Sequence, residues 1–151
     1  MKPNRILPDL QCSLICEDVR QEASGNFILI GIISLIRVPQ IPITALKLCV
    51  FNRWTAGIGQ FSEETRLVGP DGMTILRKSQ VRFQLADASK HATNVSVFPN
   101  IEFPAIGVYH VEVLVDDVMK LRFPIPLEVV QHPQQPHSGP PPGAKPPQPS
   151  E

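Results

Sequence analysis

Aspartates in the connections between predicted strands are the residues with the clearest chemical potential. Asp71, Asp116 and Asp117 all fall in such connections, as do Asp18 and Asp87. Sandwich loops that gather at one end can bind calcium through such carboxylates, so a calcium- or lipid-responsive, C2-like sandwich is one alternative for this chain. No EF-hand pattern is present, however, and an aspartate in a turn commonly bonds the backbone amides of its own turn. We therefore favour turn capping.

The three cysteines are Cys12, Cys16 and Cys49. Cys12 and Cys16 fall four positions apart on one face of a predicted strand, hence about 13 Å apart, too far for a disulfide or a shared tetrahedral metal ion. We expect small buried side chains and no metal or other cofactor. An odd cysteine count without a secretory signal indicates reduced thiols, so we expect a cytoplasmic protein.

Arg53 and Trp54 lie side by side before a segment with two glycines, Gly57 and Gly59. An arginine and an aromatic residue at a loop mouth are typical of a binding hot spot. The indole is also placed to cover the open end of the core, and we favour that role for it. His110 lies on the second face of a late strand, which could contact a partner if it is uncovered. The candidate partner-binding residues are therefore Arg53, Trp54 and His110.

Sequence motifs of common enzymes are absent. The chain has no phosphate-binding glycine loop, no dinucleotide-binding glycine pattern, no His-Glu-x-x-His and no Gly-x-Ser-x-Gly, so we expect no enzyme. A hydrolase with an unrecognised site, for which Asp18, His91 and His110 are the candidates, stays an alternative. Lysine plus arginine and aspartate plus glutamate number 14 each, which provides no basic surface to attract nucleic acid or an anionic membrane.

Strand patterns recur along the chain, and no long amphipathic helix is evident. Alternation first appears around Cys12 and returns near Val50 and again from Gly107 to Val115. Gly69-Pro70-Asp71-Gly72 and Asp116-Asp117 have strong turn chemistry. The pattern predicts an all-β fold: a single antiparallel immunoglobulin-like or Greek-key sandwich of about eight or nine strands.

Two segments are assigned particular places in this sandwich. Residues 27–36 are apolar at both parities and rich in β-branched side chains, which predicts a central strand covered on both faces. The segment is also too short to cross a membrane as a helix. The last strand, Val118 to Val130, contains Pro124 and Pro126, whose missing N–H groups fall along one side. We therefore predict a proline-guarded edge strand.

The chain divides into three parts by composition: an N-terminal extension at residues 1–8, the sandwich domain at residues 9–131 and a tail at residues 132–151. Eight of the 17 prolines lie in these last 20 residues, without a large apolar side chain. We expect a disordered tail with polyproline II character. Its proline run loosely matches ligands of aromatic-grooved domains, but a solubilising extension is favoured by composition.

Several short passages of the chain form a recognisable set: Cys16–Glu22 followed by Phe27–Ile32, then Phe51–Trp54, and Gly69–Gly72 with Gly107–Tyr109. Together they resemble an uncharacterised bacterial family of small β-sandwich proteins. The resemblance implies a sandwich fold and a bacterial cytoplasmic origin. It implies no activity and no site residues, because the family has none assigned.

The resemblance covers Asp9 to Val130 and departs from the family at one turn. Family members tend to carry Asp-Gly at the final hairpin, where this chain has Asp116-Asp117. Separately, Gly107 followed by Tyr109 resembles the tyrosine corner of Greek-key sandwiches, in which the phenol bonds back to the backbone.

A non-enzymatic protein-binding or structural module is the function that these observations favour. The expected partner is another protein, held either at an uncovered sheet face or at the loops around Trp54. The sequence does not identify this partner, the oligomeric state or the strand order.

Overall fold

The computed structural model describes residues 5–130, except for the side chain of Leu46, and these residues form nine β-strands. The strands are β1 (Asp9–Gln21), β2 (Phe27–Ile32), β3 (Ile36–Val38), β4 (Ile43–Thr55), β5 (Gly59–Val68), β6 (Ile75–Leu85), β7 (His91–Phe103), β8 (Gly107–Val115) and β9 (Val118–Val129). The prediction of an all-β fold is confirmed. Over this range no helix is long and apolar enough to cross a membrane.

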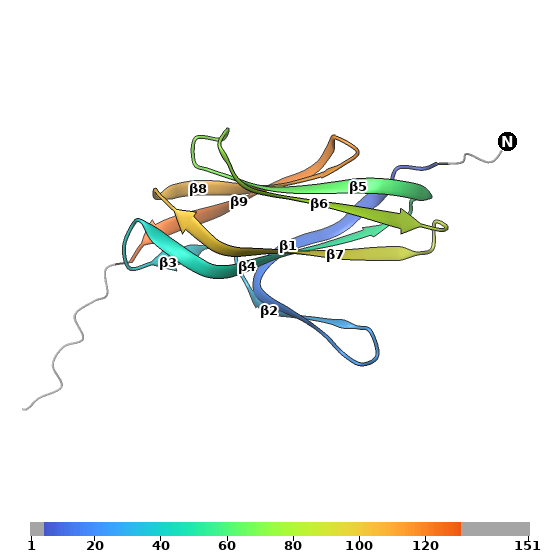
Figure 1. The fold of residues 1–151 in the computed structure, drawn as a ribbon, viewed down its shortest axis with the longest axis horizontal. Coiled ribbons are helices and arrows are strands. Elements are labelled where there is room, and N and C mark those ends of the chain that lie inside the picture. The colour runs from blue at the N-terminus through green and yellow to red at the C-terminus, as the bar shows by residue number, and fades with distance from the viewer. Residues whose placement is uncertain (1–4, 131–151) are drawn as a thin grey trace, which may run out of the picture.

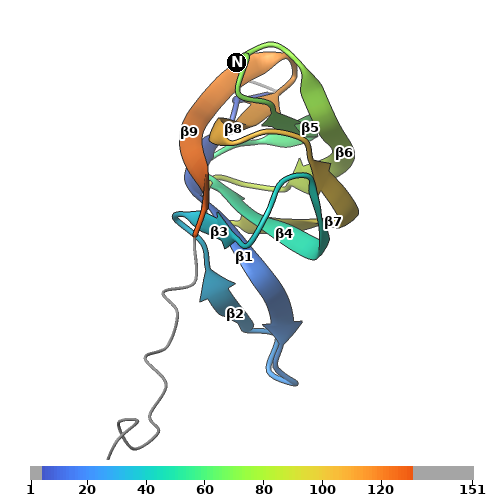
Figure 2. The same cartoon turned by 90° about the vertical axis from the view of Figure 1, so that its left-hand side faces the viewer.

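The strands form two sheets that lie one above the other (Figures 1 and 2). One sheet has the order β2-β1-β4-β7, and the other has the order β3-β9-β8-β5-β6. All pairs are antiparallel except β3 with β9. A single core of aliphatic and aromatic side chains fills the space between the sheets, because each strand turns every second residue inward.

Strand β4 shows how this alternation divides neighbouring residues. Val50 and Trp54 are buried in the core between the sheets, and Asn52 lies between them in the strand, also fully buried. Phe51 and Arg53 have the opposite parity and therefore lie on the outer face. Two residues that are adjacent in sequence, Arg53 and Trp54, are thus on opposite faces of one sheet.

A buried carboxyl group connects the two sheets. Glu63 on β5 is 1% exposed. Its Oε2 accepts hydrogen bonds from the Trp54 indole at 2.9 Å and from the Asn94 amide at 2.5 Å. Its Oε1 accepts hydrogen bonds from the Asn52 amide at 2.5 Å and from the Thr65 hydroxyl at 3.0 Å. Since Asn52 and Trp54 belong to β4 and Asn94 to β7, this Glu63 network joins both layers.

The hydrogen bond expected of a tyrosine corner is present at the start of β8. The hydroxyl of the fully buried Tyr109 donates to the carbonyl oxygen of Ala105 at 2.6 Å. The Tyr109 ring packs edge-on against Phe103, with ring centroids 5.1 Å apart. The turn that enters β8 is therefore fixed to the core.

The turn chemistry predicted from sequence is confirmed at both positions. The Gly72 N–H donates to Gly69 O at 3.0 Å, and Gly72 has φ of +77°. Asp116 and Asp117 both have positive φ, 46° and 65°, which is the pattern of a type I′ turn between the paired strands β8 and β9. An Asp-Asp pair thus forms the tight hairpin.

The predicted central strand at residues 27–36 is wrong. The first part of this segment forms β2, which pairs only with β1 at the edge of one sheet. Its last residue, Ile36, begins β3, which lies at the edge of the other sheet. Ile32 is 58% exposed, so the outward side chains are not covered. In this segment, consecutive apolar residues do not mark a buried central strand. They belong to a strand that projects from the sandwich and to the connection that crosses to the other sheet.

The predicted edge strand is correct for most of β9. β8 pairs along one side of β9, whereas β3 pairs with the other side only at residues 127–129. Pro124 and Pro126 precede this short parallel contact. In the N-terminal extension, Ile6 pairs with Ile58 through two backbone hydrogen bonds, so residues next to β1 also belong to the fold. The predicted tail at residues 132–151 lies outside the described residues.

Replacement of Glu63 tests the connection between the sheets. Glu63→Ala leaves buried indole and amide donors without their acceptor, and each such loss costs about 1–3 kcal/mol. We expect the free energy of unfolding to fall by about 3 kcal/mol or more in denaturant titration. Glu63→Gln keeps the side-chain shape but turns an amide donor toward these donors, so it should also destabilise strongly.

Glu128→Gln is the matched control for this prediction. Glu128 is on β9, and its side chain is 55% exposed in a surface pair with Arg37, so the expected change is below about 0.5 kcal/mol. Equal effects of the Glu63 and Glu128 substitutions would contradict the structural role assigned to Glu63.

Candidate binding groove

The site begins with the outward residues of β4. Phe51 and Arg53 follow the parity that faces away from the core, and the β4 register places them opposite Val95 and Thr93 of β7. Phe51 is nevertheless buried, with only 5% of its side chain exposed. Another element must therefore cover this part of the outer face.

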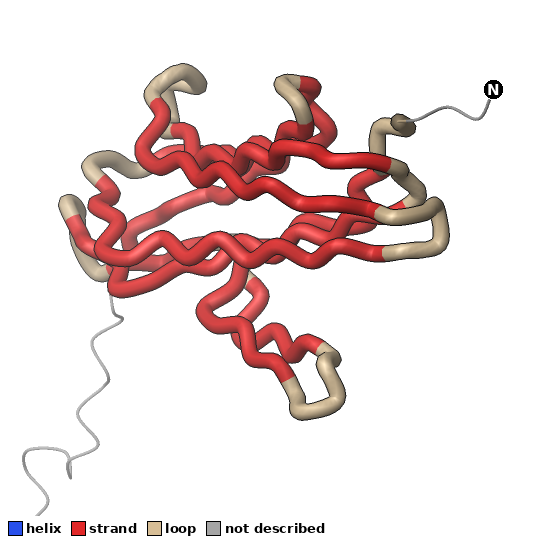
Figure 3. Tube along the Cα trace, turned by 45° about the vertical axis from the view of Figure 1, so that its right-hand side comes forward, coloured by secondary structure: helices blue, strands red, loops and turns tan. Residues whose placement is uncertain are grey.

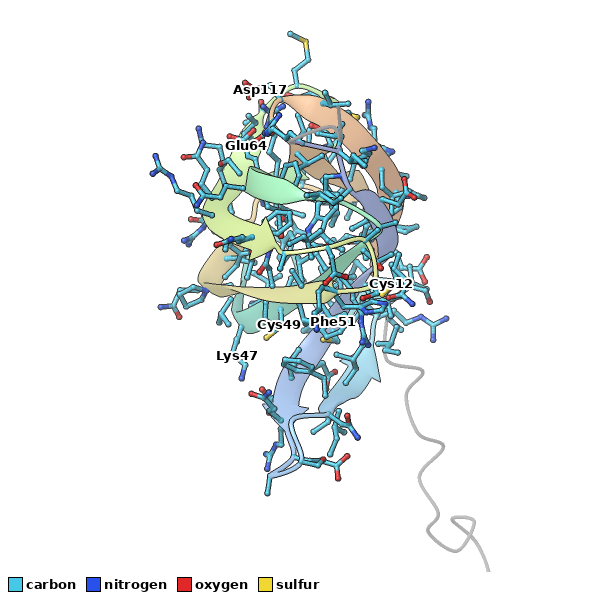
Figure 4. The ribbon with its side chains drawn as sticks, turned by 90° about the vertical axis from the view of Figure 1, so that its right-hand side faces the viewer. Cys12, Lys47, Cys49, Phe51, Glu64 and Asp117 are labelled. Carbon is cyan, nitrogen blue, oxygen red and sulfur yellow. The ribbon has the colours of Figure 1, made fainter. Side chains whose placement is uncertain are left out.

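The covering element is the hairpin formed by the second half of β1 and by β2. It projects from the sandwich on the side of the β4 sheet that faces away from the core (Figure 3). The ring of Phe27, on β2, meets the ring of Phe51, on β4, edge-on with centroids 5.6 Å apart. Figure 4 shows Cys49 and Phe51 at the junction of the sheet with this hairpin, and Glu64 and Asp117 on the far sheet.

A groove of about 460 Å³ opens between the hairpin tip and the sheet. Its lining is apolar on one side, where Phe27, Leu29 and Phe51 meet, and basic on the other, where Arg53 and His91 lie. The remaining lining residues are Gly25, Asn26 and Thr93. Among the described residues that line the groove there is no carboxylate.

Arg53 is the most unusual residue of this groove. Its Nε atom is buried and has no hydrogen-bond partner within residues 5–130, and its guanidinium forms no ion pair there. Most other arginines of the chain are paired: Arg66 and Arg122 both contact Glu112, and Arg20 contacts Asp18. A buried donor without an acceptor costs about 1–3 kcal/mol. Since Nε itself is closed to solvent and the Nη atoms are not among the buried unpartnered atoms, the groove offers the outer end of the Arg53 guanidinium to an incoming acceptor.

The three candidate partner-binding residues predicted from sequence are not brought together. Arg53 lines the groove, Trp54 is in the core bonded to Glu63, and His110 is on β8 in the other sheet. For Trp54 the favoured role in the core is the one observed. The apolar groove residues Phe27 and Leu29 were not identified, because the curl of the hairpin over the sheet leaves no local signal in sequence.

The residues considered for a hydrolase also lie apart. Asp18 bonds Lys47 at 2.8 Å, whereas His91 is opposite Thr55 in the register. Lys47 and Thr55 are eight residues apart on β4, a distance of about 26 Å along the strand. His110 lies on the other sheet, so these side chains do not form one site.

Two of the three cysteines, Cys16 and Cys49, are buried as predicted, whereas Cys12 is only partly buried. Cys16 and Cys49 are buried and directly opposite each other on β1 and β4, and all three cysteines are free. Burial raises the pKa of each thiol, and at Cys12 the neighbouring Arg53 partly offsets this effect. Because the thiolate is the reactive form, a raised pKa disfavours nucleophilic chemistry.

Two of the aspartates, Asp71 and Asp87, are occupied by their own turns, whereas Asp18, which we expected in a connection, lies within β1. Asp71 Oδ1 accepts hydrogen bonds from the backbone N–H groups of Met73 at 2.9 Å and Thr74 at 2.8 Å, and Asp87 Oδ1 accepts one from Ser89 N at 2.8 Å. These contacts are the turn capping that the sequence favoured.

The calcium candidates do not cluster either. Asp116 bonds the backbone of Ser62 near the start of β5, whereas Asp71 follows Val68 at the end of that strand, about 20 Å away for a six-residue span. Within residues 5–130, no group of three or more His, Cys, Asp and Glu side chains could hold a metal ion.

Together, these features define an all-β domain of two packed sheets with a basic, apolar-walled groove beneath a projecting hairpin. The chain matches DUF6941, a family of unknown function, over residues 11–128, and it belongs to this family. The expected membership in an uncharacterised family is thereby confirmed. A comparison with curated proteins gave no match.

The capping bonds of the turn aspartates predict an acid-sensitive stability. Hydrogen bonds donated by the hydroxyl and the backbone N–H of Thr74 lower the pKa of Asp71, and those donated by Ser89 lower the pKa of Asp87. A carboxyl group whose pKa is lower in the folded state stabilises the fold above its unfolded pKa of about 3.9 and loses that effect as pH falls through the folded pKa. We expect the free energy of unfolding to decrease below about pH 4.

Urea denaturation of the native chain and of Asp71→Asn at a series of acidic pH values checks this. Asparagine keeps an acceptor for the turn but does not titrate, so its acid-induced loss should be smaller. The same acid dependence in both proteins would show that Asp71 does not contribute.

Proposed function

We propose that this domain is a non-enzymatic protein-binding module whose groove takes a short segment that combines a carboxylate with an apolar side chain. The observation that carries the proposal is Arg53, a cation that forms no ion pair within residues 5–130 and lines a groove without a carboxylate. We further propose that the carboxylate belongs to an aspartate, a glutamate or a chain terminus of another protein.

Charge complementarity supports an acidic ligand. A carboxylate can accept two parallel hydrogen bonds from the two Nη groups of a guanidinium, and such charge-assisted bonds are about twice as strong as neutral ones. His91, on the same side of the groove, adds a second nitrogen donor or acceptor.

The apolar wall supports an aromatic or aliphatic neighbour of that carboxylate. Phe27, Leu29 and Phe51 lie beside Arg53, and aromatic residues with arginine are the usual centres of binding energy in interfaces. The volume of about 460 Å³ suits a few residues of an extended chain rather than a folded surface.

For the fold, we propose the immunoglobulin-like class. The neighbours β1-β4-β7 in one sheet and β9-β8-β5 in the other correspond to the A-B-E and G-F-C arrangement of that class. The hydrogen bond from Tyr109, at the start of the strand equivalent to F, supports the same assignment. We also propose a bacterial cytoplasmic protein, which the free cysteines support because disulfides are rare in that compartment.

Peptide binding to Arg53 variants tests the proposed groove. The probes are acetylated tetrapeptides that contain one glutamate beside one phenylalanine, with the glutamine version of each peptide for comparison. We expect the acidic peptides to shift amide NMR signals of β2, β4 and β7 around the groove. Arg53→Gln should weaken this binding at least about tenfold, because the charged pair is lost.

Arg82→Gln is the control, because Arg82 is an exposed arginine on β6 of the other sheet. It should bind the peptides as the native chain does, and both variants should keep the native circular dichroism spectrum. Equal binding by Arg53→Gln, or equal binding of the glutamate and glutamine peptides, would refute the proposal.

A further inference from the structure

The outer side of β2 is an open strand edge. β2 is the terminal strand of its sheet and pairs only with β1. The hairpin that carries it projects away from the two layers, so its far side is approachable (Figure 3). An unpaired row of backbone N–H and C=O groups of this kind is a template for another strand.

Three isoleucines make this edge unusually apolar. Ile28, Ile30 and Ile32 are 44%, 39% and 58% exposed. Ile28 and Ile30 are two residues apart in extended backbone, so their side chains share one face of the strand. Gly31, with φ of +67°, separates them from Ile32. From Phe27 to Ile33 the chain carries no charged residue and no proline.

Other described edges carry the features that prevent strand addition. β9 has Pro124 and Pro126 before its short contact with β3, and β7 contains Pro99. β6 carries Arg77, Lys78 and Arg82 among its residues, and β3 is only three residues long and contains Arg37. Charges, prolines and short strands are the usual means of blocking an edge. β2 has none of these.

The hydrogen-bond pattern identifies which groups are free. Glu22 N–H donates to Asn26 O at 2.8 Å where β1 and β2 meet. Hydrogen-bonded and non-hydrogen-bonded pairs alternate along an antiparallel ladder, so Ile28 and Ile30 turn their backbone groups toward β1. The backbone groups of Phe27 and Leu29 therefore point to the open side.

We propose that the open edge of β2 pairs with the same edge of a second copy of this chain. The two strands run antiparallel about a twofold axis at Ile30, so that Ile30 faces Ile30 of the other copy and Ile28 faces Ile32. This register keeps Ile30 of each copy in a close, non-hydrogen-bonded position and uses the free groups of Leu29. Because the edge is uncharged, no like charges meet when the two identical strands pair.

The proposed pairing joins the two four-stranded sheets into one continuous sheet. The isoleucine rows of both copies form one apolar cluster on the face opposite Phe27 and Leu29. The twofold axis is perpendicular to the plane of the joined sheet, so equivalent faces of the two copies lie on the same side. Both Arg53 grooves therefore open on the same side of the dimer. An interface of one short strand per copy is near the lower limit of about 1,000 Å² for specific association, so we expect micromolar dissociation.

Analytical ultracentrifugation of the full chain and its Ile30 variants tests this proposal. The native chain should be mostly dimeric at about 100 µM. Ile30→Lys and Ile30→Glu should each be monomeric, because two like charges would meet at the axis. An equimolar mixture of the two variants should recover a dimer, since lysine then faces glutamate.

Val97→Lys is the matched control, because Val97 is a 53% exposed β-branched residue on β7, and this variant should dimerise as the native chain does. A monomeric native chain overturns the proposal, even if β2 captures a strand of some other protein. A dimer that persists in both Ile30 variants, or a mixture that stays monomeric while both variants keep the native circular dichroism, overturns it as well.

Discussion

The hydrogen bonds to Glu63 are the constraint on which the rest of this domain depends. One carboxyl group on β5 accepts donors from β4 and from β7 of the opposite sheet. A carboxyl group in an apolar core is costly unless its bonds are made, and only one register of β4 places both Asn52 and Trp54 within reach. A slip by one residue would turn both donors out of the core. The network therefore selects the faces of β4 as well as the packing of the sheets.

The outer face of β4 follows from this selection. With Trp54 held inside, Arg53 must point outward, next to Phe51 and beneath the hairpin of β1 and β2. The same strand thus carries the hydrogen bonds to Glu63 on one side and a guanidinium without an ion pair on the other, although Asn52 Oδ1 inside the core also lacks a partner among the described residues. The position of Arg53 in an open groove, which Asn52 does not share, underlies our proposal of a carboxylate-binding module.

Local features of the fold were predictable from sequence, whereas its long-range features were not. The turn at Gly69–Gly72 and the bond of Tyr109 depend on a few neighbouring residues, so their patterns identified them correctly. Residues 27–36 were misplaced because apolarity at both parities does not distinguish a covered strand from a projecting one that crosses between sheets. The groove was missed for a related reason: Phe27 meets Phe51 only because the hairpin curls. Alternation along β4, in contrast, does indicate that Arg53 and Trp54 cannot share a face.

The single tryptophan of the chain allows the central claim to be measured directly, because it gives one indole signal in a proton–nitrogen NMR spectrum. The account places the Trp54 Nε1–H in the closed core, donating to Glu63. Its exchange with deuterium in heavy water should then be as slow as that of the backbone amides of β4 and β5. Exchange of the indole proton within seconds, while those amides remain protected, would contradict the account.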